Sequence, residues 1–292
     1  MYYYSLNEYL KNTFGEKVYK ISLDGGMTCP NRDGKIDTRG CIFCSRGGSG
    51  EFSASRNLSI TEQIAQAKER ICRKTDCKKF IAYFQPFTNT YAPVEYLEKI
   101  FTEAIAPDEI VALSVATRPD CLPDEVIGLL SRLNKIKPVW VELGLQTVHQ
   151  STADYIRRGY PLSVYDDAVK RLHKEEISVI THIIIGLPNE TDDMIVESAR
   201  YAGECSDGIK LQLLHILKGT DLCDEYYKGN VSVLSLEKYT EILVKCLQAI
   251  PKTTVIHRLT GDGDKNILVA PMWSADKKRV LNYINRAIRE SE

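Results

Sequence analysis

Three cysteines near the start of the chain have spacings that suit a metal centre. Eleven residues separate Cys29 from Cys41, and two separate Cys41 from Cys44. Thiolates are soft ligands that iron and zinc both accept, and a two-residue gap lets one tight turn direct two sulfurs at one centre. The stretch after Cys29 contains Pro, Asn, Asp and Gly residues, which favour a loop. We therefore expect a single loop to present three ligands.

The ligand count narrows the kind of site. A closed structural metal site normally has four protein ligands, whereas a site with three keeps a position open for a substrate or cofactor. These cysteines stand among Gly, Pro, Asp and Arg residues instead of in an apolar run, so core packing does not explain them. Zinc completed by a distant His or Cys stays an alternative, because Cys-x2-Cys is common to both metals.

Composition bounds the other possibilities. The chain has 292 residues, 43% hydrophobic and 26% charged, which suits one large globular domain or a domain with an extension. A formal net charge of -1 leaves nucleic-acid binding to local basic patches. No apolar run is long enough for a membrane span, and residues 1–8 lack the order of a secretory signal. The chain has nine cysteines, an odd count that does not suit the disulfide scaffold of a secreted protein. We therefore expect a cytoplasmic protein with no membrane partner.

Short apolar runs alternate with longer amphipathic ones along most of the chain. Strands are predicted at 18–23, 79–84, 110–116, 139–145, 178–185 and 209–215, and helices at 61–74, 93–106, 123–134, 164–175 and 191–205, after an amphipathic segment at 5–12. Thr61 and Thr191 are the expected N-caps, and Pro93 and Pro123 suit first helical turns. Beyond residue 217 we expect a helix at 236–250, a strand at 254–259 and a final helix from 275.

Six β/α units in series predict a parallel sheet, either an open barrel or a doubly wound sheet. Both architectures place the active site at the carboxyl ends of the strands, among the loops that follow them. The cysteine loop follows the first predicted strand directly. We therefore expect the metal centre at this edge of the sheet.

The cysteine loop and four later motifs resemble the radical S-adenosylmethionine (SAM) enzymes. The usual pattern in that superfamily is Cys-x3-Cys-x2-Cys; the wider first gap here resembles the elongator-catalytic-subunit-like branch, and most of all its uncharacterised small bacterial proteins with a Cys-x11-Cys-x2-Cys motif. The other motifs are Thr-Arg-Pro-Asp at 117–120, Leu-Gly-Leu-Gln at 143–146, Arg-Gly-Tyr at 158–160 and His-Ile-Ile-Ile-Gly-Leu-Pro-Asn-Glu-Thr at 182–191. The fold expected is α/β: a partial (β/α)6 TIM-like barrel over residues 1–217, with its N-terminal helix, and a C-terminal α/β extension over 218–292 packed on it.

The resemblance implies a [4Fe–4S] cluster on Cys29, Cys41 and Cys44, with one iron open for the amino and carboxylate groups of SAM. The implied reaction is reductive cleavage of SAM to methionine and a 5′-deoxyadenosyl radical, which abstracts hydrogen from an unidentified substrate. The implied partner is an electron donor such as flavodoxin or ferredoxin. By analogy with the elongator branch a tRNA base is the favoured substrate. Phosphate contacts would come from basic residues, among them Arg70, Arg73, Lys74, Lys78, Lys79 and 277–279.

The resemblance also implies a set of SAM contacts. A Gly-Gly-Glu-like turn of the superfamily is absent, and Gln85 stands in its place as an acceptor for the ammonium. Gln146 matches a glutamine that reaches the ribose, and Arg158 an arginine that pairs with the carboxylate, with neighbouring Arg157 as the alternative. The remaining expected contacts are Phe43, an aromatic before the third cysteine; His182, facing the barrel interior; and Gly186, in a turn against the adenine.

Further residues and two other functions stay open. Glu142 shares strand parity with Gln146 and is expected near the site, and Arg118 either faces the ligands or pairs with Asp120. The polar motif at 257–264 resembles one of the same uncharacterised group and is expected to close the pocket over the substrate. The alternatives to a radical enzyme are an iron–sulfur electron carrier or sensor without radical chemistry, and a zinc-binding protein.

Overall fold

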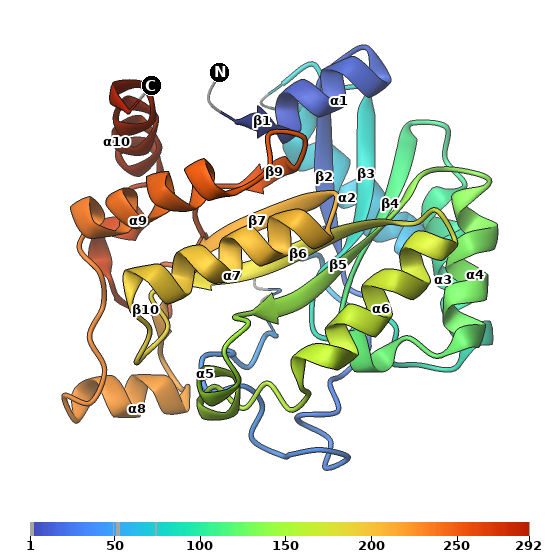
Figure 1. Ribbon diagram of the computed structural model, residues 1–292. Coiled ribbons are helices and arrows are strands. Elements are labelled where there is room, and N and C mark those ends of the chain that lie inside the picture. The colour runs from blue at the N-terminus through green and yellow to red at the C-terminus, as the bar shows by residue number, and fades with distance from the viewer. Residues whose placement is uncertain (1–2, 49, 51–52, 74, 292) are drawn as a thin grey trace.

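Eight parallel strands form one curved sheet, shown in the computed structural model of Figure 1, which describes residues 3–48, 50, 53–73 and 75–291. The strand order is β1-β9-β7-β6-β5-β4-β3-β2. From β2 to β7 neighbours in the sheet are also neighbours in the chain, so this run has no switch point and is not doubly wound. The predicted partial TIM-like barrel is confirmed. The strands are β1 Tyr4–Ser5, β2 Val18–Leu23, β3 Lys79–Phe84, β4 Ile110–Thr117, β5 Val139–Gln146, β6 Ser178–Ile185, β7 Gly208–Leu213 and β9 Val255–Arg258.

Helices cover the outer face of the sheet, and their apolar sides form the main core with the outward-facing strand residues. The helices are α1 Leu6–Phe14, α2 Ile60–Cys72, α3 Val94–Ile105, α4 Asp124–Asn134, α5 Gln150–Tyr155, α6 Leu162–Lys174, α7 Asp192–Cys205, α8 Asp221–Tyr227, α9 Leu236–Ala249 and α10 Lys277–Glu290. A small antiparallel pair, β8 Ile216–Leu217 with β10 Leu268–Ala270, lies apart from the main sheet. In the part of the chain that the structure describes, no helix has the length and apolar character to cross a bilayer.

The inner face of the sheet is arranged in layers, because alternate strand residues point inward. The lowest layer is apolar and packs on Leu10 of α1; it consists of Val18, Ile81, Ala112, Trp140 and Ile180. Two residues further along each strand the inward positions become polar. This second layer contains Lys20, Tyr83, Ser114, Glu142, His182 and Lys210. Helix α1 thus seals the amino end of the barrel, and the polar groups face its carboxyl end.

Several boundaries differ from the sequence predictions. Helix α2 is capped by Ser59 and not by Thr61, whereas the predicted cap Thr191 accepts a hydrogen bond from the backbone of Met194. Pro93 and Pro123 are themselves the N-cap residues of their helices. The predicted strand at 254–259 forms as β9 and lies inside the main sheet, between β1 and β7. The segments α5, α8, β8 and β10 have no counterpart in the predictions, and Lys74 lies outside the described residues.

Candidate active site

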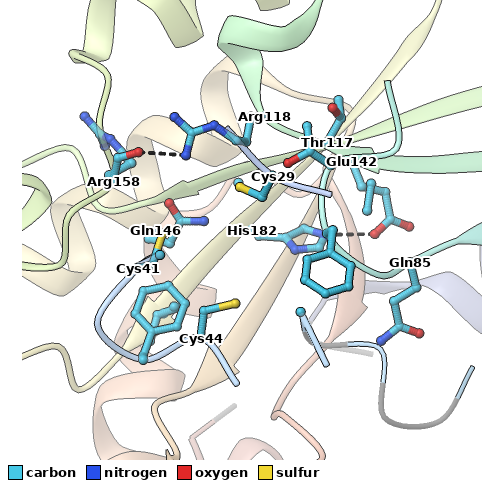
Figure 2. Close-up of a pocket in the computed structure, with 18 of the residues that line it drawn as sticks. Cys29, Cys41, Cys44, Gln85, Thr117, Arg118, Glu142, Gln146, Arg158 and His182 are labelled. Carbon is cyan, nitrogen blue, oxygen red and sulfur yellow. Dashed lines mark hydrogen bonds and ion pairs between the residues drawn. The ribbon is translucent and has the colours of Figure 1, made fainter. Parts of the chain in front are cut away.

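A pocket opens at the carboxyl ends of the strands, where the loop after β2 lies over the sheet. Cys29, Cys41 and Cys44 all line it (Figure 2), as does Phe43. Strand-end residues and the polar layer form the rest of its wall. The loop predicted to present three ligands therefore brings all three thiols to one cavity.

Specific contacts hold the cysteine loop in place. Asn31 Nδ2 donates to the carbonyl oxygen of Arg157 (2.7 Å) and lies 3.5 Å from Cys41 Sγ. Arg32 Nη2 donates to the carbonyl oxygens of Cys44 (2.8 Å) and Ser45 (2.5 Å). These bonds fix the backbone beside two of the thiols, so the loop is held both by its own residues and by the segment that contains Arg157.

The three thiols have the chemistry of metal ligands. Burial, with Cys44 as the next cause, raises the pKa of Cys41 to about 12. A thiol there ionises only beside a strong positive charge, which a bound metal supplies. Among the described residues no group of three or more His, Cys, Asp or Glu side chains is arranged to hold a single metal ion. The three thiols line one shared cavity.

Arg158 lies in the pocket wall as a buried cation. Its side chain is 1% exposed, and Nη1 donates to the carbonyl oxygens of Leu145 (3.0 Å) and Thr147 (2.6 Å). Nε donates to the carbonyl oxygen of Tyr160 (3.0 Å). The buried Nη2 has no hydrogen-bond partner among the described residues. Because an unsatisfied buried guanidinium nitrogen is costly, this atom suits a ligand with a carboxylate.

The neighbouring arginines have other partners. Arg157 pairs with Asp221 (2.6 Å), so the predicted alternative to Arg158 is directed elsewhere. Arg118 makes the expected ion pair, with Nε and Nη2 on the two Asp120 oxygens (2.9 and 2.7 Å). It also lines the pocket and donates from Nη1 to the carbonyl oxygen of Arg158 (2.9 Å, dashed in Figure 2). Arg118 thereby supports the backbone of Arg158.

Gln146 ends β5 in a left-handed backbone conformation, with φ of 63°. In the amide orientation that satisfies its neighbours, its nitrogen donates to the carbonyl oxygens of Leu145 (3.0 Å) and Gly144 (3.1 Å). A Cβ on Gly144 would lie 2.5 Å from the Gln146 amide, so this strand end requires glycine for the glutamine to fold back over the pocket.

Glu142 is the centre of the polar layer. Its side chain is fully buried; Oε1 accepts from Lys20 (2.5 Å) and Ser114 (2.7 Å), and Oε2 from His182 (2.8 Å) and Lys210. Burial alone would raise the pKa of Glu142, but the charges of Lys20 and Lys210 hold this pKa well below its ordinary value. Burial, followed by Lys210, lowers the pKa of His182 to about 4, so this imidazole is neutral near pH 7.

The structure brings together most of the residues predicted from sequence. Those that line the pocket are Cys29, Cys41, Cys44, Phe43, Gln85, Gln146, Arg158 and His182, together with Arg118 and Glu142. Gly186 is not among the lining residues; a Cβ there would lie 3.1 Å from Leu234, so its smallness serves packing. Arg258, from the motif at 257–264, also lines the cavity.

Sequence reasoning missed Lys20, Tyr83, Lys210 and Gln212. The last two alternate with apolar residues in the run Ile-Lys-Leu-Gln-Leu at 209–213. A run of this kind predicts a strand with one polar face, but it does not distinguish a face in solvent from a face inside a barrel.

The structure thus combines a partial TIM-like barrel with three loop cysteines over a polar interior. The chain belongs to the radical SAM superfamily, whose family model matches residues 38–202, and a radical SAM C-terminal domain model matches residues 206–290. It is an enzyme of that class, and membership implies a [4Fe–4S] cluster and SAM as cofactors.

Several known proteins are similar to the chain. The protein YtqA of Bacillus subtilis is 46% identical, over 98% of this chain and 89% of its own length. The protein YhcC of Escherichia coli is 34% identical, over 96% and 90%. A tRNA uridine(34) acetyltransferase of Methanocaldococcus jannaschii is 24% identical over 56% of this chain and 30% of its own. The structure of Elp3 from Methanocaldococcus infernus shares the fold, with a TM-score of 0.64, 17% identity, and coverage of 92% and 63%.

Proposed function

We propose that Cys29, Cys41 and Cys44 hold the [4Fe–4S] cluster of a radical SAM enzyme, and that SAM lies between the cluster and Arg158. The observation that carries the proposal is one cavity lined by three loop thiols and a buried, unsatisfied guanidinium nitrogen. When bound, the cluster supplies the electron that cleaves SAM into methionine and a 5′-deoxyadenosyl radical, which takes a hydrogen atom from the substrate.

The residues of the chain bind and orient the cofactor. Arg158 Nη2 pairs with the SAM carboxylate, and Gln146, folded over the strand end, contacts the ribose. Gln85 accepts from the ammonium, and Phe43 covers the cluster side of the pocket. Neutral His182 accepts from Gln212 at Nδ1 (3.1 Å) and donates to Glu142 at Nε2, and so keeps a fixed ring orientation beneath the ligand. The turn at Gly186 is proposed to lie against the adenine, as the resemblance implies, although this residue is not part of the cavity lining.

A tRNA base is the proposed substrate. Support comes from the similarity to the M. jannaschii tRNA uridine(34) acetyltransferase, which this chain matches over 30% of that protein's length. We do not propose the acetyltransferase reaction for this chain, because the match covers only 30% of that enzyme. We further propose an electron donor such as flavodoxin or ferredoxin as partner, and a cytoplasmic location on the ground of the cysteine content.

Anaerobic purification with cluster reconstitution tests the cluster assignment. We expect a brown protein with about four iron and four sulfide per chain that cleaves added SAM to 5′-deoxyadenosine under a strong reductant. Cys44→Ala should lose the visible absorbance and the cleavage, whereas Cys72→Ala, an exposed cysteine at the end of α2, should keep both. A colourless zinc protein, or a brown one that never cleaves SAM, would refute the proposal.

Arg158→Lys tests the SAM carboxylate contact. A lysine keeps the charge but loses the planar fork, so the Kd for SAM should rise by about tenfold or more, roughly the loss of one charge-assisted hydrogen bond. Arg157→Lys is the matched control, because its side chain pairs with Asp221, and it should leave the Kd unchanged. Equal effects of the two substitutions on SAM equilibrium binding would exclude the assigned role.

A further inference from the structure

Three nitrogen-bearing side chains lie side by side across the inner face of the sheet. His182 on β6 is the register partner of Lys210 on β7, and Lys210 is the partner of Arg258 on β9. The pairing of β7 with β9 is irregular just before Lys210, but all three residues line the pocket, so their side chains share its wall. The row is on the inner wall of the barrel, and the three thiols belong to the loop that lies over the ends of the strands.

The charges in this layer do not balance. Glu142 is the sole carboxylate among the described residues that line the main pocket, whereas Asp262 and Asp264 line the adjoining cavity. Its two oxygens are engaged by Lys20, Ser114, His182 and Lys210, which uses the four acceptor sites of a carboxylate. Below about pH 7, where Lys210 keeps its proton, two lysines thus share one negative charge, and Arg258 receives none of it. An excess of buried positive charge is costly unless a counter-ion arrives.

Arg258 is loosely held. Its ion pair with Asp262 spans 3.9 Å, and Asp262 also pairs with Lys277 at 2.7 Å. The side chain is 37% exposed and lines two adjoining cavities. A guanidinium in this position has donors available for a ligand in either cavity.

The second cavity gives the ligand room. It has a volume of about 310 Å³ and shares Phe43, Gln85, Ile184, Gln212 and Arg258 with the main pocket. Its far wall is the segment 261–264, whose two glycines lie against the ring of His215; a Cβ at either would come within 2.8 and 3.2 Å of that ring. This volume is at the lower end for small-molecule sites, so it suits one small molecule or a single nucleotide unit.

We propose that the substrate of this enzyme carries an anionic oxygen group, a carboxylate or a phosphate, which Lys210 and Arg258 bind together. The inference rests on the proposed function, since it places the anion in the main pocket beside the proposed SAM site, where Arg258 borders the second cavity. The anion supplies the counter-charge that Glu142 cannot give to both lysines and to Arg258. The low pKa of His182, for which Lys210 and Arg258 are contributing causes after burial, indicates the same excess of positive charge.

Anion binding to the cluster-loaded protein tests the inference. Saturating SAM without reductant keeps the proposed SAM site occupied, and sodium chloride holds the ionic strength constant. Inorganic phosphate and acetate are titrated separately by calorimetry. We expect one site per chain, with the tighter of the two anions identifying a phosphate or a carboxylate on the substrate. Arg258→Gln and Lys210→Met should each weaken that binding by about tenfold, the loss of one charge-assisted contact.

Matched controls separate the possible failures. Lys99→Met removes one exposed lysine from α3 and should leave anion binding as in the wild type. Arg258 takes no part in the Glu142 contacts, so Arg258→Gln should fold even where Lys210→Met does not, and circular dichroism checks this. Absence of binding by both anions, or unchanged affinity in both pocket variants, would overturn the inference. Failure of the proposed function would instead show as absent SAM cleavage by the wild type in a parallel assay.

Discussion

At the scale of single residues, the surroundings of Lys210 strongly change its pKa. Its side chain is 7% exposed and contacts Glu142 and the hydroxyl of Tyr83 (3.1 Å). Burial lowers the pKa of Lys210 to about 7, with Lys20 and Arg258 acting in the same direction and Glu142 opposing them. An ordinary lysine keeps its proton to about pH 10. Lys210 therefore releases its proton on folding at pH values between these two pKa values.

This shift predicts how stability depends on pH. Between about pH 7 and pH 10 the unfolded chain holds the Lys210 proton and the folded chain does not, so the free energy of unfolding rises with pH by up to about 1.4 kcal/mol per unit. Denaturant unfolding of wild type and Lys210→Met from pH 7 to about pH 9 should show this rise in the wild type alone. Glu142 is ionised in both states over this range and adds no slope.

The comparison needs a lysine substitution that leaves the interior intact. Lys99→Met, on the exposed face of α3, should follow the wild-type slope. Parallel curves for wild type and Lys210→Met would mean that Glu142 keeps Lys210 protonated throughout, and the lowered pKa of Lys210 would then be wrong.

Individual site residues differ in how far sequence could identify them. Cys29, Cys41 and Cys44 were identifiable because ligand spacing within one loop is a local property. Lys210 was not, because an alternating strand looks the same whether its polar face meets solvent or a barrel interior. Arg158 was assigned by resemblance alone. The guanidinium of Arg158 is buried against carbonyl oxygens of β5 and of the loop that follows it. These oxygens come close to the guanidinium only in the folded chain.

At the scale of elements, the start of α2 shows where local signals compete. Ser59 and Thr61 both precede the apolar periodicity, and the sequence prediction chose Thr61. In the structure Ser59 Oγ accepts from the backbone of Glu62 (3.3 Å), and the Glu62 carboxylate accepts from the backbone of Ser59 (2.8 Å). This capping box satisfies two groups at once, whereas Thr61 donates from its hydroxyl to Glu103 of α3 (2.8 Å).

The two residues should therefore differ in their effect on stability. Ser59→Ala removes the cap and should lower the free energy of unfolding by about 1 kcal/mol. Thr61→Ala removes one exposed hydrogen bond and should cost less than about 0.5 kcal/mol. Both are read from denaturant midpoints at equal m-values. If Thr61→Ala lowers the free energy of unfolding more than Ser59→Ala does, Thr61 is the N-cap of α2, as the sequence predicted.

The six β/α units were predictable, and the place of β9 was not. Each unit combines a short apolar run with an amphipathic helix, both local patterns, and sequential units of this kind favour a parallel sheet. Strand β9 joins the sheet by pairing with Tyr4 and Ser5 on one side and with residues 208–210 on the other. These partners lie far from it in sequence, so no local pattern predicts the pairing.

At the scale of the whole molecule, β9 joins distant parts of the chain. It is hydrogen-bonded to β1 near the start of the chain and to β7 in its middle, and Figure 1 shows both termini on the side of the molecule where β9 lies. Tyr239 of α9 donates to the carbonyl oxygen of Leu259 just after β9 (2.7 Å). Arg258 of the proposed anion site is also on this strand, so the catalytic pocket depends on a segment that follows residue 217.

This arrangement predicts that the chain unfolds as one unit, although residues 218–292 were predicted as an extension packed on a barrel. Loss of β9 would leave the edges of β1 and β7 unpaired, so opening of the C-terminal segment should cost nearly the whole free energy of unfolding. Calorimetry of the cluster-free chain should show a single two-state transition. Native-state hydrogen exchange should find the amides of Val255–Arg258 as protected as those of Gly208–Leu213. Two transitions, or early exchange confined to residues beyond 217, would instead identify the extension as a separate folding unit.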